Sequence, residues 1–557
     1  MRRAIRDWDV IVIGSGAGGL TAAAALARNG QRVLVLEQHY LPGGWSQSFA
    51  LSGYRFSPGV HYVGECGPGG FLRRLYEGLG LTGDLEMCEM NPDGFDHLLL
   101  GEHRFDVPRG YDRLVERMIA RFPREEAGLR RYFAVLRQLA GDVARVDELF
   151  RFPRVLALPF IAPSLVRWGL CTQRALLDAT VQDPLLRGFL AAQNGDHGLA
   201  PSRISLPAHA CLVQHYADGA YYPRGGARSI PRALVKALRR HGGGLRLRSR
   251  VARILTERGR VAGVELLSGE RIYARHVISN ADPYVTYNRL LPPELCPRER
   301  EKSRKMKYSV SLLSVFAVVD MDLRARGYDS GNYWWYPTAD VHRMYERSEV
   351  HMPDGAIDGL FLAIPTLKDP SHGYGGHKHT LEMFTFVPYE PFSVWEGTAP
   401  GRRGPEYEAL KEGLADRMIA AAEHVIPGIS RAIVLREVGT PLTNEFYCES
   451  PFGNTYGTAK TPFQLGPFSY RTEGELGGLH LCGASTLSHG VAGASISGLM
   501  AAQRILGLSS REELLGPADG SLRVYPSEHP EEWVSRVARE KEEEAREDTL
   551  DSAQAPL

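Results

Sequence analysis

The sequence predicts an α/β fold in which a parallel sheet is assembled from both ends of the chain, alongside a second domain of mixed β-sheet and helices. Three observations lead to this prediction. A β-branched apolar run at residues 9–13 enters a glycine-rich turn without a break. A second strand-to-glycine transition occurs at residues 479–484, and a helix-forming stretch follows it. The chain has 557 residues, which is too long for one small core.

The amino-terminal segment has the pattern of a strand–turn–helix–strand unit. Its parts are a strand at residues 9–13, an alanine-rich helix at 20–29 and a second strand at 32–36. Gly30 ends the helix, and Glu37 closes the second strand. Because these parts follow one another within about thirty residues, the segment predicts a Rossmann-like dinucleotide site instead of a mere tight turn.

The turn itself carries Gly-x-Gly-x-x-Gly at Gly14, Gly16 and Gly19. Gly14 permits the tight turn, Gly16 lets the backbone approach a pyrophosphate, and Gly19 lets the helix pack on the strand. The phosphates then meet free N–H groups at the positive end of the helix. Glu37 is placed to accept hydrogen bonds from ribose hydroxyls. We therefore predict nucleotide contacts from Gly14, Gly16, Ala17, Gly18, Gly19 and Glu37.

A second glycine pair, Gly43 and Gly44, follows the acid. An NAD site does not need this pair, whereas the arrangement resembles flavin enzymes of the amine-oxidase and phytoene-desaturase type, in which the loop runs towards the flavin ring. Near the other end, a helix that begins at Gly490 would point its N-terminus at the flavin N1–C2=O edge, where reduction places negative charge. The resemblance implies FAD in a discontinuous domain of amine-oxidase (GR2) type, with further contacts from Gln38, Gly43, Gly44, Trp45, Val251, Asn280, Gly483, Ala484, Val491 and Ala492.

Domain boundaries follow from the separation of these elements. An alternating pattern at residues 245–281 is typical of a β-meander that returns to the parallel sheet. The predicted FAD-binding domain comprises residues 1–110, 215–300 and 440–510; the predicted substrate-binding domain comprises 111–214, mostly helical, and 301–439; a charged tail occupies 511–557.

Composition narrows the class of protein. The formal net charge of +1 gives no reason to expect a nucleic-acid partner. The seven Cys are scattered without C-x-x-C spacing, so no metal site or disulfide framework is predicted. The chain shows no apolar signal-peptide core and no run of about twenty apolar residues. We expect a cytoplasmic protein, or one peripheral to the inner face of a membrane.

Several longer motifs resemble one family. They lie at residues 35–44, 59–64, 212–216, 222–226 and 441–447. They are similar to the retinol saturase branch of the phytoene desaturase and carotenoid isomerase superfamily. The resemblance implies an FAD-dependent oxidoreductase that acts on the CH–CH or C=C group of a conjugated polyene or similar isoprenoid lipid. Double-bond reduction is the main expectation, and cis–trans isomerisation and desaturation are the alternatives. A non-enzymatic lipid-binding flavoprotein would not need a helix aimed at the flavin.

Reduction of an alkene needs a hydride, which flavin supplies, and a proton from a positioned acid or from water. The candidates for this proton in the family-like motifs are His61, Tyr62, His215, Tyr216, Tyr222 and Arg224. His61 and Tyr62 rank first because they follow the flavin-side glycine loop. Each candidate also has a simpler interpretation, as a hydrogen-bonded core residue or as apolar tunnel lining, and Arg224 could hold the pyrophosphate instead.

Residues 152–168 form an apolar stretch that prolines interrupt and arginines flank. It is too short and broken to span a bilayer, but it suits contact with a membrane face, where Arg side chains meet headgroups. A buried helix pair under a substrate tunnel is the alternative. A lipid-soluble substrate favours the first interpretation, so we expect a lipophilic small molecule and a peripheral membrane surface as partners.

Overall fold

The first sheet carries the amino-terminal motif. The computed structural model describes residues 7–145, 158–348, 350–352, 357–518 and 520–533. Within these residues a seven-stranded sheet has the order β10-β11-β12-β1-β2-β9, with β18 paired to β12. Its parallel part comprises β1 (Trp8–Ile13), β2 (Val33–Leu36), β9 (Gly244–Arg246), β12 (Arg271–Ser279) and β18 (Leu479–Leu481). β10 (Val251–Glu257) and β11 (Arg260–Leu266) form the antiparallel meander that leads into β12.

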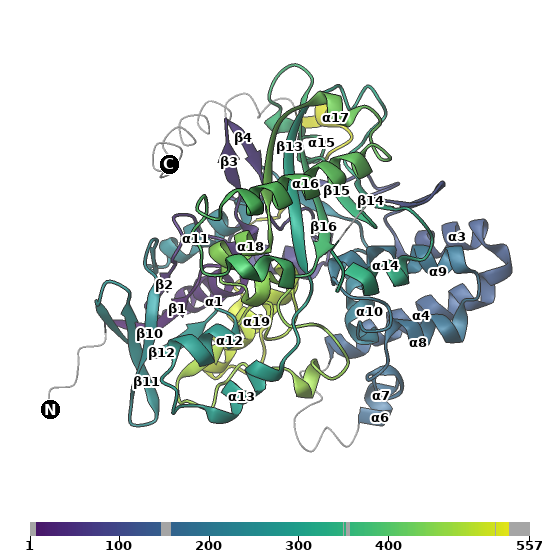
Figure 1. Ribbon diagram of the computed structural model, residues 1–557. Coiled ribbons are helices and arrows are strands. Elements are labelled where there is room, and N and C mark those ends of the chain that lie inside the picture. The colour runs from purple at the N-terminus through teal and green to yellow at the C-terminus, as the bar shows by residue number, and fades with distance from the viewer. Residues whose placement is uncertain (1–6, 146–157, 349, 353–356, 519, 534–557) are drawn as a thin grey trace.

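Three helices flank this sheet and bring the two ends of the chain together (Figure 1). They are α1 (Ala17–Arg28), α11 (Ser229–Arg240) and α19 (Gly490–Leu506). α1 packs against both of the others, and its contact with α19 is very close. A Cβ atom at Gly498 would lie 2.1 Å from the carbonyl oxygen of Gly18, so only glycine fits there. The parallel sheet is therefore completed by residues more than 450 positions apart, as between β1 and β18.

The second sheet is mixed and has the order β17-β13-β16-β15-β14-β6-β7. Its strands are β6 (Asp96–Leu100), β7 (His103–Val107), β13 (Ser311–Asp320), β14 (Asn332–Tyr336), β15 (Leu360–Ala363), β16 (Lys378–Val387) and β17 (Ile433–Gly439). Side chains alternate between its faces, as the pleat requires. On β16, Leu381 and Met383 face the helix α16 (Pro405–Ala422), whereas Phe384 and Phe386 belong to the cluster on the other face.

A group of helices covers that other face and lies to one side of both sheets (Figure 1). It contains α3 (Tyr111–Arg121), α4 (Glu126–Ala144), α8 (Gln173–Thr180), α9 (Pro184–Ala191), α10 (Leu206–His215) and α14 (Val341–Ser348). Two short helices, α6 (Leu158–Ile161) and α7 (Pro163–Trp168), project beyond α4 and α8. In the described part of the chain, no helix is both long and apolar enough to cross a membrane.

Short elements join these layers. They are the hairpin β3 (Phe49–Leu51) and β4 (Tyr54–Phe56); the small sheet of β5 (Glu86–Glu89), β8 (Tyr221–Pro223) and β19 (Arg523–Pro526); and the helices α2 (Phe71–Gly78), α12 (Pro283–Val285), α13 (Pro297–Lys305), α15 (Pro365–Lys368), α17 (Ile429–Ala432) and α18 (Pro441–Cys448).

The α/β class with a mixed sheet and a helical layer is confirmed. Two segments join a different sheet from the one that the predicted domain division implies. β6 and β7 belong to the second sheet, although residues 1–110 were assigned to the FAD-binding domain. β19 pairs in parallel with β5, although it falls in the predicted tail at 511–557. The exact domain boundaries stay a prediction.

Candidate functional site

A large cavity of about 1380 Å³ runs from the glycine loop of the first sheet to the aromatic face of the second. A pocket for one small ligand typically measures ~300–1,000 Å³. This cavity therefore has room for a dinucleotide and for a second molecule beside it. Most of its exposed lining is apolar, and polar side chains interrupt it along its length.

The predicted cofactor residues gather at one end of this cavity. Gly14 adopts a φ of +89°, which favours glycine. A Cβ on Gly16 would lie 2.7 Å from Asn280 Nδ2, and a Cβ on Gly19 would lie 2.3 Å from the carbonyl oxygen of Gly14. The backbone N–H of Gly19 donates to Asn280 Oδ1 at 3.0 Å. Gly19 thus packs the helix on the strand and does not line the cavity. The predicted residues that do line it are Gly14, Gly16, Ala17, Gly18, Glu37, Gln38, Gly43, Gly44, Trp45, Val251, Asn280, Gly483, Ala484, Val491 and Ala492.

Glu37 is held in place at the end of β2. Its carboxylate accepts hydrogen bonds from the N–H of Ser15 at 2.9 Å, from Ser15 Oγ at 2.5 Å and from the N–H of His39 at 2.8 Å. Ser15 Oγ also accepts the N–H of Gly43 at 3.2 Å. Ser15 therefore couples the first glycine loop to the second and fixes the carboxylate where a ribose would lie.

The N-terminus of α19 forms the opposite wall of the cofactor end. Its N-cap residue is His489, whose side chain makes no capping hydrogen bond to the first turn. The free N–H groups there, together with the helix dipole, favour an anion or a developing negative charge. Val491 and Ala492 of this turn line the cavity. An uncapped helix end and a groove too tight for a Cβ both fit the pyrophosphate and flavin ring of FAD.

Two buried groups support this end, and sequence reasoning missed them. Asp282 lies just after β12 and accepts hydrogen bonds from Tyr308 Oη at 2.5 Å and Ser485 Oγ at 2.6 Å. Lys460 Nζ donates to the carbonyl oxygen of Ala484 at 2.7 Å, and burial lowers the pKa of Lys460 to about 7. Asp282 could have been predicted, because an acidic residue directly after a parallel strand is a recognisable sequence pattern. No sequence pattern indicated Lys460.

At the other end the cavity meets an aromatic wall. Tyr62 stacks on Tyr216 with ring centroids 4.5 Å apart, and Phe361 stacks on Phe384 at 4.6 Å. His61 lies against the phenylalanine pair, with its ring centroid 5.1 Å from that of Phe361 and 5.6 Å from that of Phe384. All five side chains line the cavity.

The His61 side chain is oriented by a buried glutamate on β16. His61 Nδ1 lies 2.7 Å from Glu382 Oε2, and the Glu382 side chain is only 1% exposed. Glu382 Oε1 accepts the N–H of Ser57 at 2.5 Å. His61 Nε2 has no hydrogen-bond partner among the described residues, so it is available to a molecule in the cavity. Glu382 is a third residue that sequence reasoning missed, after Asp282 and Lys460.

Tyr62 Oη lies between two carboxyl groups, 2.8 Å from Asp196 Oδ2 and 3.2 Å from Asp96 Oδ2. Asp196 lines the cavity, whereas Asp96 lies behind it. Burial and the neighbouring Asp96 charge raise the pKa of Asp196 well above its ordinary value. Burial also raises the pKa of Asp96 to about 6, although hydrogen bonds from Asn332 and Gln193 oppose this shift.

The other predicted catalytic residues are differently placed. His215 lines the cavity, but its Nε2 accepts the N–H of Gly64 at 2.8 Å and its Nδ1 pairs with Glu65 at 3.1 Å. Tyr222 and Arg224 are not part of the lining. Arg224 Nη1 instead lies 2.5 Å from Glu86 Oε2. The geometry therefore favours His61 and Tyr62 over His215, Tyr222 and Arg224.

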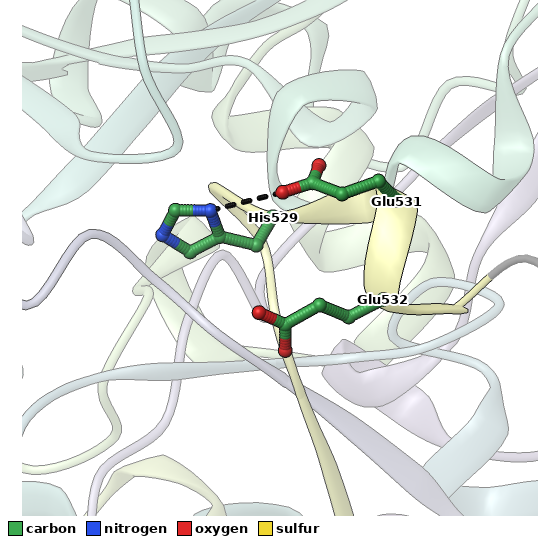
Figure 2. A group of neighbouring side chains, drawn as sticks. All are labelled: His529, Glu531 and Glu532. Atoms are coloured by element: carbon green, nitrogen blue, oxygen red, sulfur yellow. Dashed lines mark hydrogen bonds and ion pairs between the residues drawn. The ribbon is translucent and has the colours of Figure 1, made fainter.

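A possible ligand set for a metal ion also occurs in the described residues, on the turn after β19. It consists of His529, Glu531 and Glu532 (Figure 2). All three side chains are exposed, and none lines the cavity. Exposed acidic groups of this kind are common on protein surfaces, and the cavity chemistry does not involve them.

The fold and the site define a flavin-dependent oxidoreductase: a glycine loop, an acid at the end of the second strand and an uncapped helix N-terminus meet at one end of a large apolar cavity. The chain matches the family described as flavin containing amine oxidoreductase over residues 17–346, and it belongs to that family. Its cofactor is FAD.

Proteins of known name are similar in sequence to this chain over most of its length. It is 31% identical to all-trans-retinol 13,14-reductase of Macaca fascicularis, with 89% of this chain and 85% of the relative covered. It is 32% identical to the protein of the same name from Danio rerio, with 90% and 87% covered. Chloroplastic prolycopene isomerase of Daucus carota is 30% identical, with 92% and 83% covered. The chain belongs to the family of these reductases and isomerases.

Solved structures share the fold. An oxidoreductase from Methanosarcina mazei has a TM-score of 0.60 at 18% identity and covers 88% of this chain and 99% of its own. Putrescine oxidase has a TM-score of 0.59 at 16% identity, with 90% and 99% covered. These likenesses concern the fold alone.

Proposed function

We propose that this protein uses FAD to add hydrogen across a carbon–carbon double bond of a conjugated polyene or related isoprenoid lipid. One observation carries the proposal: the cavity is continuous from the cofactor loops to an aromatic wall and is lined mainly by apolar side chains. Relatives named as retinol reductases and prolycopene isomerases support the substrate class. Isomerisation and desaturation are alternatives within the same site.

Bound FAD supplies the two-electron chemistry, and the chain must supply orientation, exclusion of water and a proton. The paired rings of Phe361 and Phe384 offer flat apolar surface to a polyene. His61 and Tyr62 are the polar side chains next to these rings, so we place one of them beside the reacting carbons. Both face the cavity from the segment that follows the flavin-side loop.

The mass of the product identifies the reaction. The holoenzyme with reduced flavin is incubated without oxygen with retinoid and carotenoid polyenes. Reduction adds two hydrogens, isomerisation leaves the mass unchanged, and desaturation, tested with oxidised flavin, removes two. A mass change of plus two supports the proposal. If no polyene changes and none oxidises the reduced flavin, the proposed substrate class is wrong.

Single-turnover flavin oxidation tests the two side chains. Tyr62→Phe keeps the ring and removes the hydroxyl, while His61→Gln keeps a hydrogen-bonding group of similar length. Loss of a general acid typically costs ~100- to 10,000-fold in rate. Loss of a wall residue weakens substrate binding instead. If both variants carry FAD and react at the parent rate, neither side chain serves the chemical step.

We also propose that the surface near α7 contacts a membrane. Residues 152–157 of the predicted contact segment lie outside the described part of the chain. In the remainder, Phe160 is 88% exposed and Val166 is 53% exposed. Leu170, 59% exposed, belongs both to this surface and to the cavity lining. Phe468 from another loop is likewise exposed and lines the cavity. Exposed apolar side chains thus surround an opening that a lipid-soluble substrate could use directly from a bilayer.

Liposome co-sedimentation tests this surface. Phe160→Glu combined with Val166→Glu should reduce binding to phospholipid vesicles and leave bound FAD unchanged. Val394→Glu is the matched control, because Val394 is 75% exposed and does not line the cavity. Equal sedimentation of all three proteins would show that this surface does not hold the protein on lipid.

A further inference from the structure

Tyr62 cannot donate hydrogen bonds to both Asp196 and Asp96 at once, so the two acids cannot both be ionised and both be hydrogen-bonded to it. A phenol has one hydrogen to donate, yet Tyr62 Oη is within hydrogen-bond distance of Asp196 and of Asp96. If both acids were ionised, one of the two contacts of Tyr62 Oη would bring two hydrogen-bond acceptors together with no hydrogen between them. If one acid carries a proton, it can donate to Tyr62 Oη while Tyr62 donates to the other. Both contacts are then hydrogen bonds.

The neighbours of the two acids decide which one is protonated. Asp96 accepts Asn332 Nδ2 at 2.9 Å and Gln193 Nε2 at 2.6 Å in addition to Tyr62. Three donors around one carboxyl group stabilise its charged form. Asp196 has Tyr62 as the side-chain partner of Oδ2, and its Oδ1 has no partner among the described residues. The proton therefore belongs on Asp196.

The position of Asp196 connects the two halves of the site. Its backbone carbonyl accepts a hydrogen bond from His489 Nε2 at 2.7 Å. His489 is the N-cap residue of α19, whose first turn lines the cofactor end. Asp196 is thus held on the cavity wall between the aromatic rings and the helix end that faces the flavin.

We propose that Asp196 is a catalytic residue that holds a proton in the resting enzyme and delivers it to the carbon of the reacting double bond. This inference rests on the proposed function and deepens it. Two C–H bonds replace the π bond. Bound reduced FAD would supply a hydride, whose electron pair makes one C–H bond, and the π pair takes the Asp196 proton to make the other. The O–H bond of Asp196 breaks and leaves a carboxylate. The Tyr62 hydroxyl then turns from Asp96 to Asp196 and stabilises the new charge. Water returns a proton to Asp196 before the next turnover.

The surroundings favour a neutral acid before the reaction. The groups whose charge acts on this site are Tyr62, Asp96, Tyr216, Tyr336, Tyr345, Lys368, Tyr456 and His489. Burial raises the pKa of Tyr62 and Tyr216 well above the ordinary value, so both stay neutral. Burial lowers the pKa of His489 to about 3, so this ring is neutral as well. Lys368 is the cation of this set, and its Nζ lies 5.9 Å from the centre of the Tyr62 ring. Its charge stabilises the ionised form of Asp96 and does not act on Asp196.

Asp196→Asn tests the proposal in the holoenzyme. The amide keeps the shape of the side chain and can still donate to Tyr62, but it has no acidic proton. Single-turnover oxidation of reduced flavin by a polyene should slow by ~100- to 10,000-fold, as expected for loss of a general acid, at unchanged FAD content. Asp178→Asn is the control, because Asp178 is an exposed aspartate on α8 that forms ion pairs with Arg174 and Arg187.

Infrared spectroscopy supplies a measurement that needs no substrate. The holoenzyme at neutral pH should show the carbonyl band of a protonated carboxylic acid, and the parent-minus-Asp196→Asn difference spectrum should contain this band. In Tyr62→Phe the band should remain, because loss of the hydroxyl donor favours the neutral acid further. If the difference spectrum contains only a carboxylate band, Asp196 is ionised and the proposal is wrong.

The outcomes separate this inference from the proposed function. If His61→Gln slows the reaction and Asp196→Asn reacts like the parent, the polyene reaction stands and Asp196 is not its acid. If the parent itself reacts with no polyene, the substrate class and the role of Asp196 both fall. If Asp196→Asn does not fold, Asp196→Glu replaces it: the acid band should change frequency in the parent-minus-Asp196→Glu spectrum, and an unchanged band would show that the proton is not on Asp196.

Discussion

Arg224 Nη1 lies 2.5 Å from Glu86 Oε2, so the arginine of the Pro-Arg-Gly-Gly motif is tied to strand β5 and does not reach the cavity. The two side chains are only 9% and 13% exposed. A pair buried to this degree leaves a costly charge behind when one partner is removed. The motif that looked catalytic in the sequence therefore has a structural partner.

Arg224→Met should lower the free energy of unfolding by about 1.5–3 kcal/mol, because Glu86 loses one charged hydrogen-bond partner but keeps Arg523, whose Nη2 lies 2.6 Å from Glu86 Oε1. The folded fraction should retain FAD and react with substrate at the parent rate. Urea unfolding measures the first effect. Arg246→Met is the control: Arg246 pairs with Glu270 on the surface, where such a pair contributes about 0–1 kcal/mol. A folded Arg224→Met protein with normal stability and a large loss of rate would restore the catalytic interpretation.

Gly16→Val should abolish retention of FAD. A Cβ at this position would lie 2.7 Å from Asn280 Nδ2 and would occupy the path of the pyrophosphate. Flavin absorbance after gel filtration measures retention. Gly141→Val on α4 is the matched control, because a Cβ there meets no atom within 4 Å. Full flavin absorbance in Gly16→Val would contradict the assignment of this loop.

Stability should fall as the pH rises from about 6.5 to 9 through His97. Burial lowers the pKa of His97, but hydrogen bonds to Asp106 and Asp329 outweigh it and raise the pKa to about 9. The folded protein then holds a proton that the unfolded chain, with a pKa near 6.5, has released. The protonated ring therefore stabilises the fold fully below pH ~6.5, and this contribution is lost as the pH passes ~9.

The His97→Gln variant isolates this effect from other titrating groups. The difference in unfolding free energy between parent and variant should shrink by about 3 kcal/mol between pH 6.5 and pH 9. His529→Gln, a change at an exposed histidine, should give the same difference at both pH values. A parent-minus-His97→Gln difference that does not change with pH would show that His97 is not charged in the folded protein.

The cofactor end of the site could be predicted because its signals are local. Gly14, Gly16 and Gly19 occur in one turn, and backbone sterics alone dictate their spacing. The N-terminus of α19 was also found, since a glycine turn before a helix has the same local character. Residues that meet only through the tertiary fold carry no such pattern: His61 and Glu382 are 321 positions apart.

The sheet to which a strand belongs also could not be predicted from local sequence. Residues 1–110 were assigned to the FAD-binding domain as one continuous block, but local sequence does not say which sheet a strand joins, and β6 pairs with β14 from the second sheet. Asp196 was missed because a single aspartate in a helical region is usually a solvated surface residue. Its role depends on Tyr62, which lies 134 positions away.

The close packing of α1 against α19 has a consequence for biosynthesis. Residues 8–37 leave the ribosome early, but the partner helix ends at Leu506, about 470 residues later. At a translation rate of ~5–20 residues per second, the amino-terminal half of the flavin site stays incomplete for roughly 20 to 90 s. During that time the alanine-rich face of α1 has no partner from α19, and a nascent chain released before Gly490 has no helix to close the cofactor groove. Flavin capture is therefore one of the last events in the maturation of this protein, and until then α11 is a helix that can cover α1.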